Sequence, residues 1–219
     1  MVYIVVPVVV VSGSVAAVLL LIRRTRGKSL ALLGPRKSGK TTLATFLQTG
    51  EIPRGYKPTV MRSTVKARRK VPGTGRKLLL GIKMRDVALK LTMLDNPGVT
   101  PLGDKTNYGI WQDSATKVDA VCYLVDVSKL SNKKYRDIAV NGARHIARWD
   151  LHECRKLLIL THTDLDPAWE RGDPDEISGR AAVKDLRREL QAEEVIMGTL
   201  KDDDGRRDLT YLLLQLLAR

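Results

Sequence analysis

A glycine-containing segment near the start of the chain constrains its fold more than any other part of the sequence. Residues 34–41, GPRKSGKT, fit the pattern G-x-x-x-x-G-K-[ST]. The apolar run SLALL precedes this segment at 29–33, and residues 42–50 follow it with helical spacing and a final glycine. A glycine loop that opens a helix directs several backbone N–H groups at one point, where they favour an anion. The sequence therefore predicts a strand, a phosphate-binding loop and a helix in succession.

The side chains of this loop have separable tasks. Lys40 is expected to reach the β- and γ-phosphates of a nucleotide, and the Thr41 hydroxyl is expected to bind Mg²⁺. The backbone lines the phosphates, so we assign nucleotide binding to the whole loop and to the residue after it. These residues are Gly34, Pro35, Arg36, Lys37, Ser38, Gly39, Lys40, Thr41 and Thr42. The pattern by itself does not distinguish ATP from GTP.

Strand and helix patterns alternate through the rest of the chain. Apolar runs predict strands at 89–94, 120–125, 156–160 and 195–197. Helical spacing predicts helices at 111–117, 131–149, 180–191 and 208–217. The turn sequence PGTG at 72–75 separates two segments that can pair as an antiparallel hairpin. This alternation is typical of an α/β protein with an open, mostly parallel sheet, and 219 residues suffice for one such domain.

The first 22 residues form one long apolar segment, unlike the short apolar runs of the predicted strands. Residues 2–22 carry no charge, and as a helix they would span ~31 Å, close to the hydrocarbon thickness of a bilayer. Only Met1 precedes the run, whereas four basic residues follow it, so its flanks are those of an uncleaved anchor and not of a signal peptide. The basic residues are Arg23, Arg24, Arg26 and Lys28.

The positive-inside bias of these flanks predicts a single-pass membrane protein with its N-terminus outside and the rest of the chain in the cytoplasm. We therefore divide the chain into a transmembrane anchor at 1–22, a basic link at 23–28 and a globular domain at 29–219. The alternative is a buried, β-rich core segment, because valine-rich runs that contain residues such as Pro7 and Gly13 also form strands.

Two further motifs follow the phosphate-binding loop in order. YKPTV at 56–60 places Thr59 nineteen residues after Lys40, where it could fold over the phosphates with its hydroxyl on Mg²⁺ and its N–H on the γ-phosphate. Asp95 and Gly98 form a D-x-x-G string where an apolar strand ends. This ordered set resembles the Ras-like and Arf-like small GTPases, a branch of the P-loop GTPases.

The resemblance implies the fold and several residue roles. The fold would be a P-loop GTPase domain with helices on both faces of the sheet and an antiparallel hairpin at one edge, preceded here by one transmembrane helix. Thr41, Thr59 and Asp95 would hold Mg²⁺, the aspartate through a water. Lys40, Thr59 and Gly98 would form the catalytic set, and the Gly98 N–H would contact the γ-phosphate.

The string LLILTHTD at 157–164 resembles the strand that leads into the N-K-x-D motif for guanine recognition. Asp164 would accept hydrogen bonds from N1–H and the 2-amino group of guanine, a donor pair that adenine lacks. Thr161 replaces the usual asparagine and His162 the usual lysine, and His162 is either a contact to the base or a loop histidine without a ligand. Thr199, in MGTL at 197–200, lies where the family's S-A-x motif contacts the base.

One departure from the family bears on hydrolysis. Val99 follows the D-x-x-G motif in place of the glutamine that orients the attacking water, so intrinsic hydrolysis is expected to be slow and to depend on a partner. Arg36 and Lys37 occupy loop positions that are often small in Ras. They either neutralise phosphate charge in cis or, as we favour, point to solvent.

Charge and cysteine content add limits on partners. The net charge is +14, and residues 54–90 hold twelve basic residues against the single acid Asp86. This stretch is either a solvated hairpin face, a surface that binds anionic lipid or a surface that binds an acidic cytosolic effector. Nucleic acid is the least favoured partner, because Tyr56 is the only aromatic residue of the stretch and single-strand and RNA binding depend on aromatic stacking. Cys122 and Cys154 are too few for a disulfide scaffold and are expected to be free thiols in a reducing compartment.

The favoured hypothesis is a membrane-anchored, Mg²⁺-dependent switch that binds GTP and GDP and hydrolyses GTP slowly until a partner assists. Its architecture resembles the β-subunits of signal-recognition-particle receptors, and a bacterial membrane-tethered GTPase with an unrelated partner fits equally well. A nucleotide-stabilised membrane scaffold with little hydrolysis is the main alternative, which Val99 keeps open. An ATPase is a third hypothesis, disfavoured by the position of Asp164.

Overall fold

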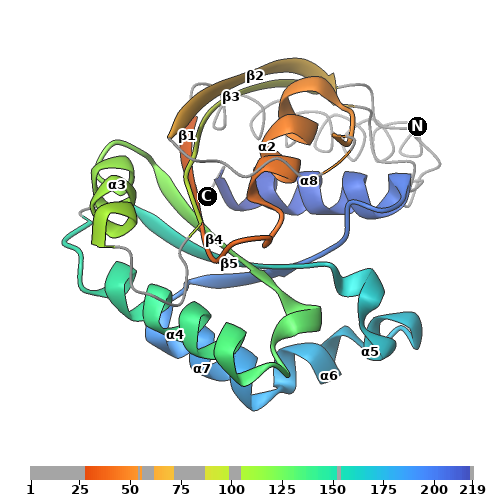
Figure 1. Cartoon of the computed structure of the whole chain (residues 1–219). Coiled ribbons are helices and arrows are strands. Elements are labelled where there is room, and N and C mark those ends of the chain that lie inside the picture. Colours follow the sequence, from red (N-terminus) through yellow and green to blue (C-terminus); the bar gives the residue numbers. More distant parts are fainter. Residues whose placement is uncertain are drawn as a thin grey trace, which may run out of the picture.

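One six-stranded sheet organises the described part of the chain (Figure 1). The computed structural model describes residues 28–53, 55, 62–71, 87–98, 105–151 and 154–217. The strand order is β2-β3-β1-β4-β5-β6, and only the β2–β3 pair, at one edge, is antiparallel. The strands are β1 (Lys28–Leu33), β2 (Ser63–Val71), β3 (Val87–Asp95), β4 (Ala120–Asp126), β5 (Arg155–Thr161) and β6 (Glu194–Met197). The predicted α/β class and mostly parallel sheet are confirmed.

Helices cover both faces of this sheet (Figure 1). Helices α2 (Lys40–Thr49) and α8 (Asp203–Leu217) pack on one face through residues such as Leu47 and Leu213. Helices α3 (Lys105–Ala115), α4 (Lys133–Ala147) and α7 (Ala181–Leu190) pack on the other. Two short helices, α5 (Pro167–Glu170) and α6 (Pro174–Gly179), and two 3₁₀ turns, η1 (Val127–Lys129) and η2 (Thr163–Leu165), complete the described elements.

Strand β1 lies inside the sheet and divides the core between its two faces. Its last four residues are fully buried, and alternate side chains enter different clusters. Leu30 and Leu32 pack toward α2 and α8, whereas Ala31 and Leu33 pack toward α3 and α4. Because side chains alternate along a strand, this pattern fixes the register of β1.

Several predicted boundaries shift in the structure. Helix α3 starts six residues before the predicted 111–117, and α8 starts at Asp203 instead of 208. Asp203 and Asp204 suit the positive end of the helix dipole, so this helix extends beyond its apolar spacing. Strand β1 begins at Lys28, one residue before the predicted strand. The Lys28 Nζ lies 2.9 Å from Asp119 Oδ1.

The two short helices were missed by the sequence-based prediction. Each begins with an aspartate N-cap followed by proline at the first helical position: Asp166 accepts from Ala168 N, and Asp173 accepts from Glu176 N. The dipeptide Asp-Pro is therefore the signal that could have located both helices, because it combines a side-chain cap with a φ angle suited to a first turn.

Parts of the sequence-based prediction lie outside the described residues. These are the anchor at 1–22, the link up to 27 and the turn at 72–75. Within the described residues, none of the helices has the length and apolar character needed to cross a membrane.

Both cysteines are free thiols, as predicted. Burial raises the pKa of Cys122 to about 12 and that of Cys154 to about 11. Both thiols are therefore protonated at neutral pH and poorly reactive.

Candidate functional site

The loop between β1 and α2 adopts the tight path that its glycines allow. Gly34, Lys37 and Gly39 have φ angles of 141°, 60° and 84°. A Cβ atom on Gly34 would lie 2.1 Å from the carbonyl oxygen of Leu124 in β4, so only glycine fits there. Gly39 is the N-cap of α2. The predicted strand, loop and helix are therefore present, and the helix N-terminus faces the loop.

Lys40, the first residue of α2, lies inside this loop and is 5% exposed. Its ammonium group donates to the carbonyl oxygens of Gly34 at 3.0 Å and of Pro35 at 2.7 Å. Burial lowers the pKa of Lys40 from 10.5 to about 8; Asp95 opposes this shift and the Arg36 guanidinium adds to it. A buried cation surrounded by loop backbone is suited to an anionic group such as a phosphate.

Thr41 and Asp95 come together although 54 positions separate them in the sequence. The Thr41 hydroxyl donates to Asp95 Oδ2 at 2.9 Å. Asp95 ends β3 beside Leu32 of β1, which is why the two side chains meet, and it is 2% exposed. A hydroxyl and a carboxylate are hard oxygen ligands of the kind that Mg²⁺ prefers, so the residues present fit the predicted ion.

Gly98 lies directly against the phosphate-binding loop. A Cβ atom on Gly98 would be 2.8 Å from both the backbone nitrogen and Cα of Arg36, so a larger residue would displace one of the two segments. The structure thus brings D-x-x-G and the loop into contact. The side chains of Arg36 and Lys37 are exposed, which agrees with the solvent-facing hypothesis.

Thr161, at the end of β5, ties the predicted base-recognition segment to the loop. Its hydroxyl donates to Ser38 O at 3.0 Å, with Val125 O at 3.2 Å as a second acceptor. His162 has a φ of 57°, and its Nδ1 lies 3.0 Å from the Thr161 hydroxyl. Its Cε1 is 3.6 Å from a Cβ position on Gly39, so the imidazole borders the loop and does not stand apart from it.

Asp164 and Thr199 are also adjacent. The Thr199 hydroxyl donates to Asp164 Oδ1 at 2.6 Å, and Lys201 Nζ lies 3.9 Å from Asp164 Oδ2. The Asp164 side chain is 17% exposed, so part of the carboxylate faces solvent. The two segments assigned to the base therefore form one unit beside the loop.

Asp126 belongs to the same edge of the sheet, and sequence-based prediction missed it. It ends β4, is 1% exposed, accepts from the backbone and hydroxyl of Ser128 and pairs with Lys129. His162 Nδ1 lies 3.6 Å from its Oδ2. The signal was an aspartate at the carboxyl end of a buried parallel strand, which is where ligands bind in open α/β sheets.

Thr42 lies in α2, and two residues singled out from the sequence are not placed by the structure. Thr59 and Val99 lie outside the described residues, as does most of the basic stretch at 54–90.

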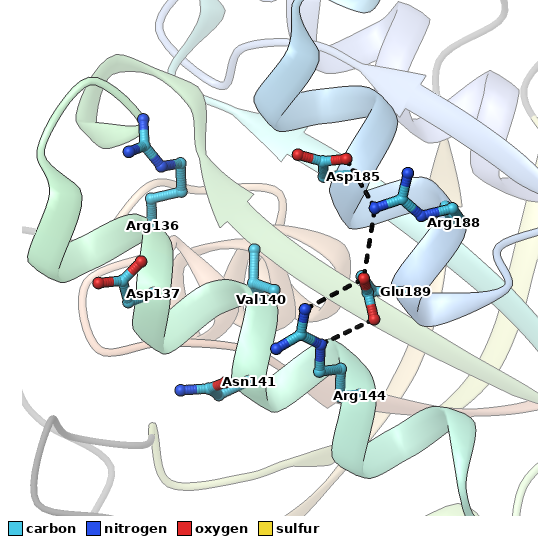
Figure 2. Close-up of a pocket in the computed structure, with 8 residues that line it drawn as sticks. All are labelled: Arg136, Asp137, Val140, Asn141, Arg144, Asp185, Arg188 and Glu189. Carbon is cyan, nitrogen blue, oxygen red and sulfur yellow. Dashed lines mark hydrogen bonds and ion pairs between the residues drawn. The ribbon is translucent and has the colours of Figure 1, made fainter.

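A separate groove lies between α4 and α7 on the face opposite α2 (Figures 1 and 2). Its volume is about 350 Å³; the Arg144–Glu189 ion pair joins α4 to α7 across it, whereas Arg188 pairs with Asp185 within α7. Arg144 and Arg188 thus find carboxylate partners within the groove. None of its lining residues was assigned a role from the sequence.

Solved structures that resemble this chain give a comparison for its fold. The fold is similar to that of the Arl6 (BBS3) small GTPase from Trypanosoma brucei, solved with the nucleotide analogue GppNp, at a TM-score of 0.58 and 16% identity. The similarity covers 88% of this chain and 97% of that chain. No protein-family model matches the chain, and no curated protein matches it in sequence. At this identity the comparison shows the fold alone, which this chain shares with that small GTPase.

The lowered pKa of Lys40 predicts a pH-dependent affinity for nucleotides. Phosphates bind the charged lysine, which loses its proton near pH 8 in the free protein, so affinity is expected to fall by about fourfold between pH 7 and 8.5. Titrations of the full chain with a fluorescent guanine nucleotide measure this affinity at each pH. The upper pH of about 8.5 is chosen so that N1 of the guanine base keeps its proton. In Lys40→Arg the guanidinium stays charged, and the residual affinity should not vary with pH. A constant affinity in the unaltered chain would contradict the prediction.

Proposed function

We propose that this chain is a Mg²⁺-dependent switch that binds guanine nucleotides and hydrolyses GTP slowly. The observation that carries the proposal is the meeting of three groups of residues, far apart in sequence, at one edge of the sheet. These are the loop with Lys40 and Thr41, the segment with Asp95 and Gly98, and the pair formed by Asp164 and Thr199. Each supplies the chemistry that one part of GTP requires.

The phosphate end of the nucleotide would bind at the loop. Lys40 would exchange its carbonyl partners for phosphate oxygens, while the helix N-terminus of α2 contributes N–H groups. Thr41 and Asp95, with Thr59, would hold Mg²⁺, which when bound neutralises charge on the β- and γ-phosphate oxygens. The Gly98 N–H would contact the γ-phosphate, so that this segment responds to its loss.

The base would bind where Asp164 meets Thr199. The Asp164 carboxylate accepts from Thr199 on one oxygen and keeps further lone pairs for the N1–H and 2-amino hydrogens of guanine. Thr161 holds the adjacent loop, and His162, which borders Gly39, would lie beside the base. Adenine presents no matching donor pair, so this site favours GTP and GDP over ATP.

Competition binding tests the guanine preference. GTP and GDP, but not ATP, are expected to displace a fluorescent guanine nucleotide from the detergent-solubilised full chain in Mg²⁺. Asp164→Ala should weaken GTP binding by roughly 100-fold, because two hydrogen bonds to a charged acceptor are lost. Asp175→Ala removes an exposed carboxylate from the first turn of α6 and serves as the control. Displacement by ATP as effective as by GTP would refute guanine specificity.

Hydrolysis is proposed to be slow and to depend on a partner. Val99 offers no hydrogen bond to the attacking water, and an arginine supplied by another protein is worth roughly 10³- to 10⁵-fold in such reactions. Single-turnover GTP hydrolysis by the purified chain should therefore be slow and should rise when a membrane extract is added. Arg36→Ala should leave the basal rate unchanged, since that side chain is exposed. A slower Arg36→Ala variant would instead assign this arginine a role in cis.

The same measurement separates the second candidate function, a nucleotide-stabilised scaffold that recruits a cytosolic partner. Val99 favours this alternative, because a protein that scarcely hydrolyses GTP remains in one state. GTP binding without turnover, even with extract present, would support the scaffold.

Residues 1–22 are proposed as a membrane anchor that leaves the GTPase domain in the cytoplasm. The support is the uncharged run and the basic residues after it. We expect the full chain to remain in the membrane pellet after washing with alkaline carbonate, with its C-terminal domain accessible to protease from the cytoplasmic side. Release of the chain by carbonate would contradict the anchor.

A further inference from the structure

Helix α3, at the left of Figure 1, forms side-chain hydrogen bonds to the segment that follows β3. Asn107 Nδ2 donates to Gly98 O at 3.3 Å, Trp111 Nε1 donates to Pro97 O at 2.7 Å, and Ser114 Oγ lies 2.7 Å from Asn96 Oδ1. Residues 107, 111 and 114 are spaced by four and three positions, so they share one face of the helix. Three residues on that face thus bind three consecutive residues of the loop.

These contacts are shielded from water. Trp111, Ser114 and Asn96 are 0% exposed, and Asn107 is 8% exposed. Asn96 also donates to Leu94 O at 2.8 Å, which closes the turn at the end of β3. Because a buried polar group that loses its partner is costly, the loop is held firmly against α3.

The bond from Trp111 sets the direction of one particular peptide group. Pro97 O and the Gly98 N–H belong to the same peptide unit, and in the planar trans form these two groups point in opposite directions. The indole fixes the carbonyl toward α3, so the Gly98 N–H points away from the helix. On its other side, Gly98 touches the backbone of Arg36 in the phosphate-binding loop.

We propose that Trp111 is a positioning residue that selects for the terminal phosphate of GTP. Its indole N–H holds the Pro97–Gly98 peptide in the orientation that offers the Gly98 N–H to the γ-phosphate. This inference rests on the proposed guanine nucleotide function and deepens it. GDP has no γ-phosphate, so the contribution of Trp111 concerns GTP alone.

The test compares the affinities of the full chain for GDP and for a non-hydrolysable GTP analogue in Mg²⁺. Trp111→Phe removes the N–H donor and should lower the analogue affinity by roughly threefold to tenfold, the usual effect of one hydrogen bond. The GDP affinity should stay within twofold of the unaltered chain. The ratio of the two affinities is therefore the readout, because a general loss of structure would reduce both.

Tyr123→Phe is the matched control. The Tyr123 hydroxyl donates to Ala139 O at 2.7 Å and is buried in the same aromatic cluster, where its ring packs edge-on to Trp111. Tyr123→Phe thus removes a buried hydrogen bond to a backbone carbonyl, equal in length to that of Trp111. The carbonyl that it releases lies in α4 and not in the segment after β3. It should lower thermal stability without changing the ratio.

A second variant keeps the test decisive if Trp111→Phe fails to fold. Replacement of Trp111 by 3-benzothienylalanine keeps the two-ring shape and substitutes sulfur for the N–H group, and it should lower the ratio to the same extent. An unchanged ratio in this variant would overturn the inference while the proposed function stands. Failure of the unaltered chain to bind either nucleotide would overturn both.

Discussion

The parallel pairing of β1 with β3 on one side and β4 on the other is the constraint on which the rest of the structure depends. Parallel neighbours end at the same edge of a sheet, so the loop after β1 meets the segment after β3 and the aspartate at the end of β4. The register is held because Leu32 and Leu33 enter opposite halves of the core. A slip by one residue would exchange these side chains and separate Thr41 from Asp95.

The electrostatics of the site follow from this arrangement. The loop buries the ammonium of Lys40 among carbonyl groups, which lowers its pKa although Asp95 is near. Such a cation is more favourable when an anion binds beside it, so nucleotide binding and stability of the fold are coupled in this proposal. The same coupling gives the affinity its dependence on pH.

Helix α3 adds a second level to the site. Gly98 lies between the phosphate-binding loop and a helix whose buried side chains determine how its peptide group is turned. In this proposal nucleotide sensing depends on a tryptophan that acts through the Pro97–Gly98 peptide. The aromatic cluster around Trp111 reaches α4 through Tyr108, which stacks on His145 at 4.0 Å between ring centroids.

Sequence alone determined the class of fold, the phosphate-binding loop and the order of the motifs, because these depend on local chemistry: glycines at positive φ, alternating apolar runs and short spacings. It missed α5 and α6, whose Asp-Pro starts lack strong periodicity. The tertiary structure decided the rest. It set the hydrogen bond from Thr161 to Ser38 across 123 positions, the burial of Asp126 at the end of β4 and the hydrogen bond from Trp111 to Pro97. Such contacts depend on strand order and helix packing, which bring distant side chains within hydrogen-bond distance and which no local pattern encodes.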